Sequence, residues 1–326
     1  MGPLRMPQTD ENDHVIVVQD LCRDFGETRA VRNLELVVRR GELFGLVGPD
    51  GAGKTTTIRM LAGILQPTSG NAWIDGVSVV EDPEGVKEHI AYMPQRFGLY
   101  QDLTVIENLV FYADLFQVPA KDRASRMEEL FAFSRLGPFK NRLAGALSGG
   151  MKQKLGLACA LIHSPRLILL DEPTNGVDPV SRRDFWRILY ELLNKGITIL
   201  VSTAYLDEAE RTTRTALISD GKLIDVGTPA YLKSLVHGVM MELAPSDVSG
   251  ARKSLVLGDG VLDVNVFGDT LHVRLENKSV ESVVKHLLSQ GGVEILSWKW
   301  IDPSMEDAFL SLIPRQTSRR QKGYPD

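Results

Sequence analysis

A glycine-rich run that ends in a lysine and two threonines has the residue types of a phosphate-binding loop. The run consists of Gly48, Pro49, Asp50, Gly51, Ala52, Gly53, Lys54, Thr55 and Thr56, which completes the pattern G-x-x-x-x-G-K-[ST]. The glycines allow successive backbone N–H groups to point inward, and a helix that starts here adds the positive end of its dipole. Lys54 can then reach the outer phosphates of a nucleotide, and the Thr55 hydroxyl can ligate the accompanying magnesium ion.

Two adjacent carboxylates end an apolar run further along the chain. Leu167 to Leu170 leads directly into Asp171 and Glu172, and Pro173 follows. Such a run is typical of a strand in the middle of a parallel sheet. Unpaired acids there would cost several kcal/mol if buried, so a cation is expected beside them. We predict that Asp171 holds magnesium and that Glu172 orients the attacking water; the alternative is a pair of surface carboxylates.

Three more features have two interpretations each. Phe25 stands in an expected turn between strands, where its ring could stack on a nucleotide base or simply join the core. Gln95 follows an expected strand over 88–93 and could meet a ligand at the sheet edge or face solvent. Ser148, Gly149 and Gly150 begin a helix, either as an ordinary N-cap or as a second anion-binding helix end.

The pattern of apolar residues indicates an α/β core around these groups. A buried strand over 43–47 precedes the loop and a helix over 55–65 follows it. Short strands over 14–19 and 30–38 predict a small β layer before the loop, and helical periodicity dominates an insert at about 96–165. Another buried strand covers 198–202.

The last third of the chain has its own alternation of elements. Strands are expected over 239–243, 261–267, 271–276 and 293–300, with helices over 249–256 and 280–289. This β-α-β-β-α-β order predicts a small α+β domain of the ferredoxin-like kind. The expected organisation is a polar lead 1–13, a nucleotide-binding domain 14–235, an α+β domain 236–313 and a polar tail 314–326.

The composition is that of an ordinary globular protein and excludes several functional classes. A formal net charge of −5 over 326 residues does not favour nucleic-acid binding as the main role. Two cysteines far apart in sequence make a disulfide framework or a zinc site improbable. The chain contains no apolar run of about 18 residues, and its start is too polar for a secretory signal. We therefore expect a protein of the reducing cytoplasm that reaches a membrane only through a partner.

Together these motifs resemble the ATP-binding subunit of an ABC transporter, in which a phosphate loop and a strand-borne Asp-Glu pair flank an L-S-G-G sequence. The resemblance covers 14–235, and the segments 205–209 and 302–309 narrow it to ABC-2-type exporter ATPases of the drug-resistance type. It implies a P-loop NTPase core with an N-terminal β layer and a helical subdomain.

The resemblance also assigns roles to single residues. Phe25 would stack on adenine, Gln95 would contact Mg²⁺ and the γ-phosphate, and Ser148 to Gly150 would cover ATP in trans. Asp178 would belong to the loop that follows the carboxylates. The expected ligands are ATP and Mg²⁺, with Thr55, Gln95 and Asp171 at the metal and Lys54, Gln95 and Glu172 in catalysis.

The same resemblance implies partners. Two such domains sandwich two ATP molecules, and closure of the sandwich pulls on transmembrane permease subunits of the ABC-2 type. The chain would then sit peripherally on the inner face of the cell membrane. Its second ATPase domain could be an identical copy or, as we favour, a different chain, and no nucleic acid is expected.

One position departs from the family pattern. The last core strand of the family ends in Thr-His, whereas this chain has Thr203 and Ala204. Loss of one preorganised donor at the γ-phosphate typically lowers the rate about 10²- to 10³-fold. We therefore expect slow hydrolysis at this chain's own site. The alternatives are a regulatory clamp that holds ATP with little hydrolysis and a soluble ABC ATPase that acts outside transport.

Overall fold

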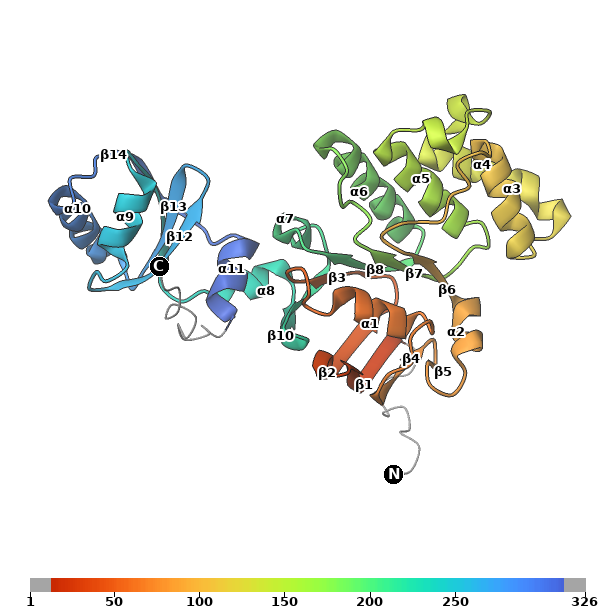
Figure 1. Ribbon diagram of the computed structural model, residues 1–326, viewed down its shortest axis with the longest axis horizontal. Helices are drawn as coiled ribbons and strands as arrows, with labels where there is room; N and C mark the ends of the chain where they lie inside the picture. Colours follow the sequence, from red (N-terminus) through yellow and green to blue (C-terminus); the bar gives the residue numbers. More distant parts are fainter. Residues whose placement is uncertain (1–12, 314–326) are drawn as a thin grey trace, which may run out of the picture. The chain divides into compact units, whose positions relative to one another are not determined.

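The computed structural model describes residues 13–313, which form two compact units divided between residues 228 and 229. The expected tail 314–326 and nearly all of the expected lead 1–13 lie outside the described residues. Figure 1 shows the helices and strands of both units.

A six-stranded sheet in the order β10-β9-β3-β8-β7-β6 forms the centre of the first unit. Strands β9, β3, β8, β7 and β6 are parallel, and β10 is antiparallel to β9. Their bounds are β3 Leu43–Val47, β6 Ile90–Met93, β7 Leu167–Asp171, β8 Thr198–Thr203, β9 Arg214–Ser219 and β10 Lys222–Gly227. Because parallel strands carry their carboxyl ends to one edge, the segments after β3, β6, β7 and β8 meet there.

A second, antiparallel sheet in the order β2-β1-β4-β5 forms the expected β layer. Helix α1 (Lys54–Leu61) lies between the two sheets (Figure 1). Its Ile58, Met60 and Leu61 share one buried apolar cluster with side chains of both sheets. The strand bounds are β1 His14–Phe25, β2 Thr28–Arg39, β4 Ser69–Ile74 and β5 Val77–Ser78. Strand β1 extends well beyond the expected 14–19 because register shifts carry its pairing with β2 through to Phe25.

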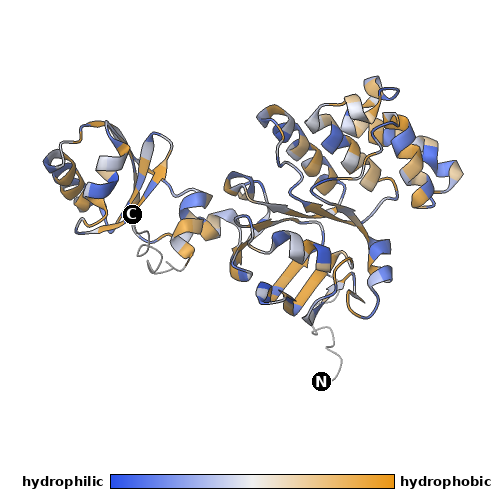
Figure 2. Ribbon diagram, viewed as in Figure 1, coloured by the Kyte–Doolittle hydropathy of each residue, from blue (hydrophilic) through white to orange (hydrophobic). Residues whose placement is uncertain are grey.

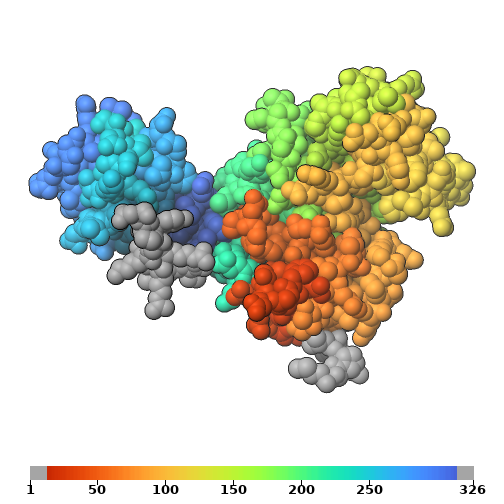
Figure 3. Space-filling model, viewed as in Figure 1, coloured from red at the N-terminus to blue at the C-terminus, as the bar shows by residue number. Residues whose placement is uncertain are grey.

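The helices α3 Val105–Leu115, α4 Ala120–Ser134, α5 Gly149–Ala160 and α6 Pro179–Asn194 lie on the other face of the central sheet and share one buried apolar cluster with it. The first three, with 3₁₀ turns at Gly137–Phe139 and Ala144–Ala146, form the expected helical insert. Helix α2 (Pro83–His89) instead joins the apolar cluster of α1 through Val86, and a short α7 covers Leu206–Ala209. Figure 2 shows mixed polar and apolar faces on α3 and α4, whereas the strands are mostly apolar. In Figure 3 these helices, coloured yellow to green, form a continuous surface beside the orange surface of earlier residues.

One expected strand was partly wrong. The residues Glu88 and His89 were assigned to the strand that leads to Gln95, but they end helix α2. The Asp82 side chain caps that helix through the Gly85 N–H, and Pro83 fits its first turn. The strand β6 begins only at Ile90.

The second unit contains the expected β-α-β-β-α-β order and a four-stranded antiparallel sheet in the order β12-β13-β11-β14. The ferredoxin-like prediction is therefore confirmed. Helices α9 and α10 pack on one face of this sheet through a common apolar cluster. The bounds are β11 Val239–Pro245, α9 Val248–Leu255, β12 Val261–Phe267, β13 Thr270–Leu275, a 3₁₀ turn Lys278–Val280, α10 Glu281–Gln290, β14 Ile295–Ile301 and α11 Met305–Leu312.

The division between the units falls earlier than the expected boundary at residue 235. Helix α8 (Pro229–Ser234) was expected to close the nucleotide-binding domain, but it groups with the second unit. Its Leu232 is fully buried, and α8 packs against α11. Among residues 13–313, no helix is both long and apolar enough to cross a membrane.

Candidate nucleotide site

The phosphate loop links β3 to α1 in a conformation that only its glycines allow. Gly53 has φ +100°, and a Cβ atom there would lie 2.4 Å from the Ala30 carbonyl oxygen. No side chain caps α1, so its first N–H groups are left to a ligand at the loop. The loop borders a cavity of about 360 Å³, lined by Ala30, Asp50, Gly51, Gly53, Lys54, Thr55, Thr56, Gln95, Glu172 and Asn175.

Lys54 is buried and already satisfied by groups of the site. Its Nζ donates to the carbonyl oxygens of Gly48 at 2.8 Å and Pro49 at 3.0 Å. The same Nζ lies 3.0 Å from Oε1 of Glu172 and 3.9 Å from the exposed Asp50. Lys54 and Glu172, the residue directly after β7, therefore neutralise each other in this structure.

One carboxylate oxygen of Asp171 is bonded and the other is free to bind a ligand. Its Oδ1 accepts from Thr55 Oγ1 at 3.0 Å and from Ser202 Oγ at 2.8 Å. Its Oδ2 is buried and has no hydrogen-bonding partner among residues 13–313. Burial raises the pKa of Asp171, although the hydrogen bonds from Ser202 and Thr55 act in the opposite direction.

This donor set fits Mg²⁺, which prefers oxygen ligands and keeps several of its waters. Asp171 and Thr55 supply two such oxygens 3.0 Å apart. The Gln95 side chain is exposed and lines the same cavity, where its amide oxygen can serve as a third ligand. Magnesium bound there would neutralise phosphate charge.

Glu172 follows directly and is held in an uncommon backbone conformation. Its φ is +48°, a region that non-glycine residues occupy rarely and often at functional sites. Its N–H is directed at Ser202, with 3.0 Å to Oγ and 3.2 Å to the carbonyl oxygen. Its Oε2 accepts from Gln95 Nε2 and Asn175 Nδ2, each at 3.2 Å. The carboxylate is thus aimed into the cavity.

A smaller cavity of about 160 Å³ lies beside Glu172 at the position of Ala204. Its lining consists of Asp50, Glu172, Thr174, Asn175, Thr203, Ala204 and Tyr205. Behind it, the fully buried Glu208 accepts from Thr174 at 2.8 Å and from Thr203 at 2.7 Å. These bonds fix the ends of β7 and β8 relative to each other. Ala204 itself supplies no polar side-chain group to this space.

Other predicted site residues lie outside these two cavities. Phe25 is 48% exposed, which excludes the alternative that its ring joins the core, and its ring centroid lies 4.6 Å from the Arg23 guanidinium. Its stacking on a nucleotide base stays a prediction. Ser148 does cap α5, because its Oγ accepts from the Met151 N–H at 3.3 Å. Asp178 caps α6 in the same way by accepting from the N–H groups of Val180 at 3.1 Å and Ser181 at 2.9 Å.

The signature glycines differ in their surroundings. A Cβ on Gly150 would lie 2.4 Å from Cβ of Ser181, so close packing of α5 on α6 requires glycine there. Gly149 faces open space, and packing gives no reason for a glycine at this position. Its role in trans remains a prediction.

Three residues of the site were missed from the sequence. The Ser202 hydroxyl donates to the Asp171 carboxylate and accepts from the Glu172 N–H. Asn175 donates to the Glu172 carboxylate, and Glu208 links the segments that follow β7 and β8. A polar residue at the end of an apolar strand, as Ser202 is, was the only signal that could have identified one of them. The other two depend on contacts between distant segments.

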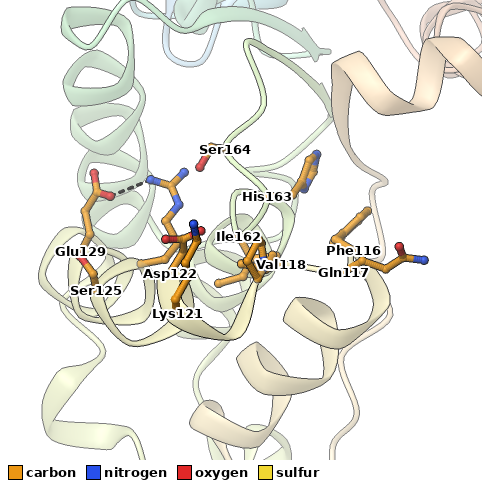
Figure 4. A pocket seen from close by; sticks show the side chains of 12 residues that line it. Phe116, Gln117, Val118, Lys121, Asp122, Ser125, Glu129, Ile162, His163 and Ser164 are labelled. Carbon is orange, nitrogen blue, oxygen red and sulfur yellow. Dashed lines mark hydrogen bonds and ion pairs between the residues drawn. The ribbon is translucent and has the colours of Figure 1, made fainter.

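A third cavity, of about 420 Å³, lies in the helical layer (Figure 4). The His163 ring stacks on Phe116 with centroids 4.2 Å apart, and its Nε2 donates to the Ile90 carbonyl oxygen at 3.1 Å. This bond leaves Nδ1 as an acceptor, which is buried and has no partner within the described part of the chain. The cavity also contains the Arg126–Glu129 ion pair (2.7 Å) drawn in Figure 4.

His163 predicts a pH dependence of stability. Burial lowers its pKa below the ordinary 6.5, and the charge of Arg126 acts in the same direction. As the pH falls below 6.5, the unfolded chain binds a proton that the native state does not. The free energy of unfolding of the first unit therefore decreases towards low pH, and His163→Gln makes this decrease shallower. Denaturant unfolding between pH 6.5 and about 5 tests this; an unchanged slope would contradict it.

The fold and the site together define a P-loop nucleotide-binding protein. A family model described as ABC transporter matches residues 31–175. The chain is 42% identical over 307 residues to the "Probable multidrug ABC transporter ATP-binding protein YbhF" of Escherichia coli, a match that covers 93% of this chain and 52% of the relative. This chain thus spans about half the length of that relative.

Other relatives match along nearly their whole length. The daunorubicin/doxorubicin resistance ATP-binding protein DrrA of Streptomyces peucetius is 34% identical, with 91% of this chain and 92% of DrrA covered. The Nod factor export ATP-binding protein I of Rhizobium etli is 35% identical, with 92% and 93% covered. The chain therefore belongs to the family of ABC transporter ATP-binding proteins.

Solved structures agree with this assignment. The first unit resembles cbiO1 of Clostridium perfringens, part of the ABC transporter complex cbiONQ, with a TM-score of 0.63 and 25% identity. That match covers 68% of this chain and 92% of cbiO1. A dimeric ATP-binding cassette in a post-hydrolysis state with ADP and Pi matches with a TM-score of 0.59 and 26% identity over 65% of this chain and 98% of that one.

Proposed function

We propose that this chain binds ATP with Mg²⁺ and hydrolyses it to drive export through a transmembrane permease. The proposal rests on one observation: Lys54, Thr55, Glu172 and Gln95 line one cavity, and Asp171 is hydrogen-bonded to Thr55 at its edge. Backbone N–H groups and Lys54 bind the phosphates, and Asp171 with Thr55 holds the metal. Glu172 is the group placed to accept a proton from water.

The export direction and the partners rest on the relatives. YbhF, DrrA and the Nod factor protein are named for multidrug transport, drug resistance and export, respectively. The helical layer offers a surface for a permease, because Tyr100, Leu115 and Phe116 are exposed on or beside α3. ABC-2-type permease subunits are the proposed partners, and the chain would act on the inner face of the cell membrane.

Dimerisation is proposed because Ser148, Gly149 and Gly150 line neither cavity of their own site. In the proposed dimer, these three residues cover a nucleotide that is bound to a second ATPase domain. We favour a different chain as this partner, because Ala204 weakens the site built on Lys54 while Ser148 to Gly150 remain intact.

Slow hydrolysis at the Lys54 site follows from the cavity at Ala204. The cavity beside Glu172 has a volume of about 160 Å³, and the methyl group of Ala204 offers it no hydrogen-bond donor. We expect the purified chain to turn ATP over slowly, and Ala204→His to raise the rate by up to about 10²- to 10³-fold. Steady-state phosphate release measures both. Rapid turnover by the unmodified chain, unchanged by the histidine, would contradict the proposal.

The second candidate is a regulatory clamp that holds ATP and scarcely hydrolyses it. The absence of a side-chain hydrogen-bond donor at position 204 also favours this function, because it would slow hydrolysis without preventing ATP binding. Single-turnover hydrolysis separates the two functions: bound ATP converts to ADP within the transport cycle of an exporter subunit and persists in a clamp. The assay is carried out on the chain together with the membrane proteins that co-purify with it.

A further inference from the structure

The two carboxylate oxygens of Glu172 have different partners. Oε1 lies 3.0 Å from Lys54 Nζ, whereas Oε2 accepts from the side-chain amides of Gln95 and Asn175, each at 3.2 Å. One oxygen is thus paired with a cation and the other with two neutral donors. Gln95 is already expected to contact Mg²⁺ and the γ-phosphate, whereas no role in binding or catalysis has been assigned to Asn175.

A bound nucleotide affects the two oxygens unequally. Lys54 belongs to the phosphate loop, so the negative phosphates compete with Glu172 for its ammonium group. Oε1 then loses its cation and is left facing the space in front of the γ-phosphate. The amide donors at Oε2 carry no charge that phosphate would attract.

Asn175 is held in place by the turn after β7. Its N–H donates to the Glu172 carbonyl oxygen at 3.2 Å, which closes the turn. The preceding Thr174 is buried and donates to the fully buried Glu208 at 2.8 Å. Asn175 lines both cavities at Glu172, and position 204 contributes only a methyl group to the smaller one. Its amide therefore occupies a defined position at the carboxylate.

We propose that Asn175 is a positioning residue of ATP hydrolysis, which together with Gln95 fixes Oε2 of Glu172 so that Oε1 receives the proton of the attacking water. The inference rests on the proposed function. In the step, the water oxygen forms a bond to the γ-phosphorus. The bond from that phosphorus to the bridging oxygen breaks, its electron pair stays on ADP, and the water proton passes to Oε1.

Two substitutions test the role of the amide. Asn175→Ala removes the donor, and kcat is expected to fall about 10- to 100-fold, as loss of a hydrogen bond to a charged group predicts. Asn175→Asp keeps the shape but places a second carboxylate against Oε2, so kcat falls at least as far. KM and the affinity for a fluorescent ATP analogue stay within about twofold in both, because Asn175 does not contact the phosphates in this arrangement.

The controls separate positioning from folding. Asn175 is exposed, so both variants should melt close to the unmodified chain. Asn175→Gln retains an amide donor and should recover part of the rate. Asn194→Ala alters an exposed asparagine at the end of α6 and should leave every readout unchanged. Single-turnover assays are run in the natural chain and in Ala204→His, so that a slow natural rate remains measurable.

The outcomes distinguish this inference from the proposed function. A chain that binds no ATP overturns the proposed function itself. A chain that binds and hydrolyses ATP, with Asn175→Ala and Asn175→Asp as active as the unmodified chain, overturns only the role of Asn175. Loss of analogue binding in Asn175→Ala would assign the residue to nucleotide binding and overturn its positioning role.

Discussion

Glu172→Gln is expected to lower single-turnover ATP hydrolysis by about 10²- to 10⁴-fold, the range that general-base groups supply. Glutamine has the same shape but cannot take up the water proton. ATP affinity should persist, because the phosphates are bound by the loop N–H groups and Lys54. The measurement is conversion of bound ATP to ADP, alongside binding of a fluorescent ATP analogue.

The matched control is Glu84→Gln, which neutralises a carboxylate on α2 whose side chain is 80% exposed. Both variants should also be made in Ala204→His, where the baseline rate is higher and the fall easier to measure. Hydrolysis by Glu172→Gln at the rate of the parent chain would show that another group accepts the proton. It would leave the binding half of the proposed function intact.

Lys54→Met is expected to act twice, on turnover and on stability. Removal of the ammonium group should weaken ATP binding and lower turnover by about 10²- to 10³-fold, because the charge on the outer phosphates loses a fixed cation. It should also destabilise the nucleotide-free chain by about 3–5 kcal/mol, because the mostly buried Glu172 carboxylate loses its ion-pair partner. ATPase assays and denaturant unfolding measure the two effects separately.

The stability effect has a specific test. Adding Glu172→Gln to Lys54→Met removes the unpaired charge, so the double variant should recover much of the lost stability without recovering activity. Lys222→Met, at an exposed lysine of β10, is the control for loss of a positive charge. Equal destabilisation of the single and double variants would contradict the ion pair between Lys54 and Glu172.

Much of the nucleotide site could be predicted from the sequence because it is built from short motifs, each of which is contiguous along the chain. The loop from Gly48 to Thr56 and the pair Asp171 and Glu172 are short motifs with fixed backbone requirements. The topology of the second unit was also predictable, because strand and helix periods alternate clearly over 239–301. Local pattern and tertiary structure agree in these segments.

Some local patterns led to wrong assignments. The residues 88–89 have strand-like neighbours, yet capping by Asp82 and the first-turn Pro83 place them at the end of α2. Helix α8 follows the nucleotide-binding strands in sequence, yet it buries Leu232 in the second unit. A helix cap determines where α2 ends, and a distant packing partner determines which unit α8 joins. Hydrophobic periodicity alone contains neither kind of information.

A phosphate loop, a pair of strand-end carboxylates and an alanine where the family has histidine can all be identified from residue type and spacing. The groups that meet at Glu172 cannot, because their contacts depend on the fold. Lys54, Gln95 and Asn175 come from separate segments that converge because parallel strands end at the same edge of the sheet. The unequal partners of the two Glu172 oxygens follow from that convergence, since spacing along the chain carries no information about which atoms of distant segments come into contact.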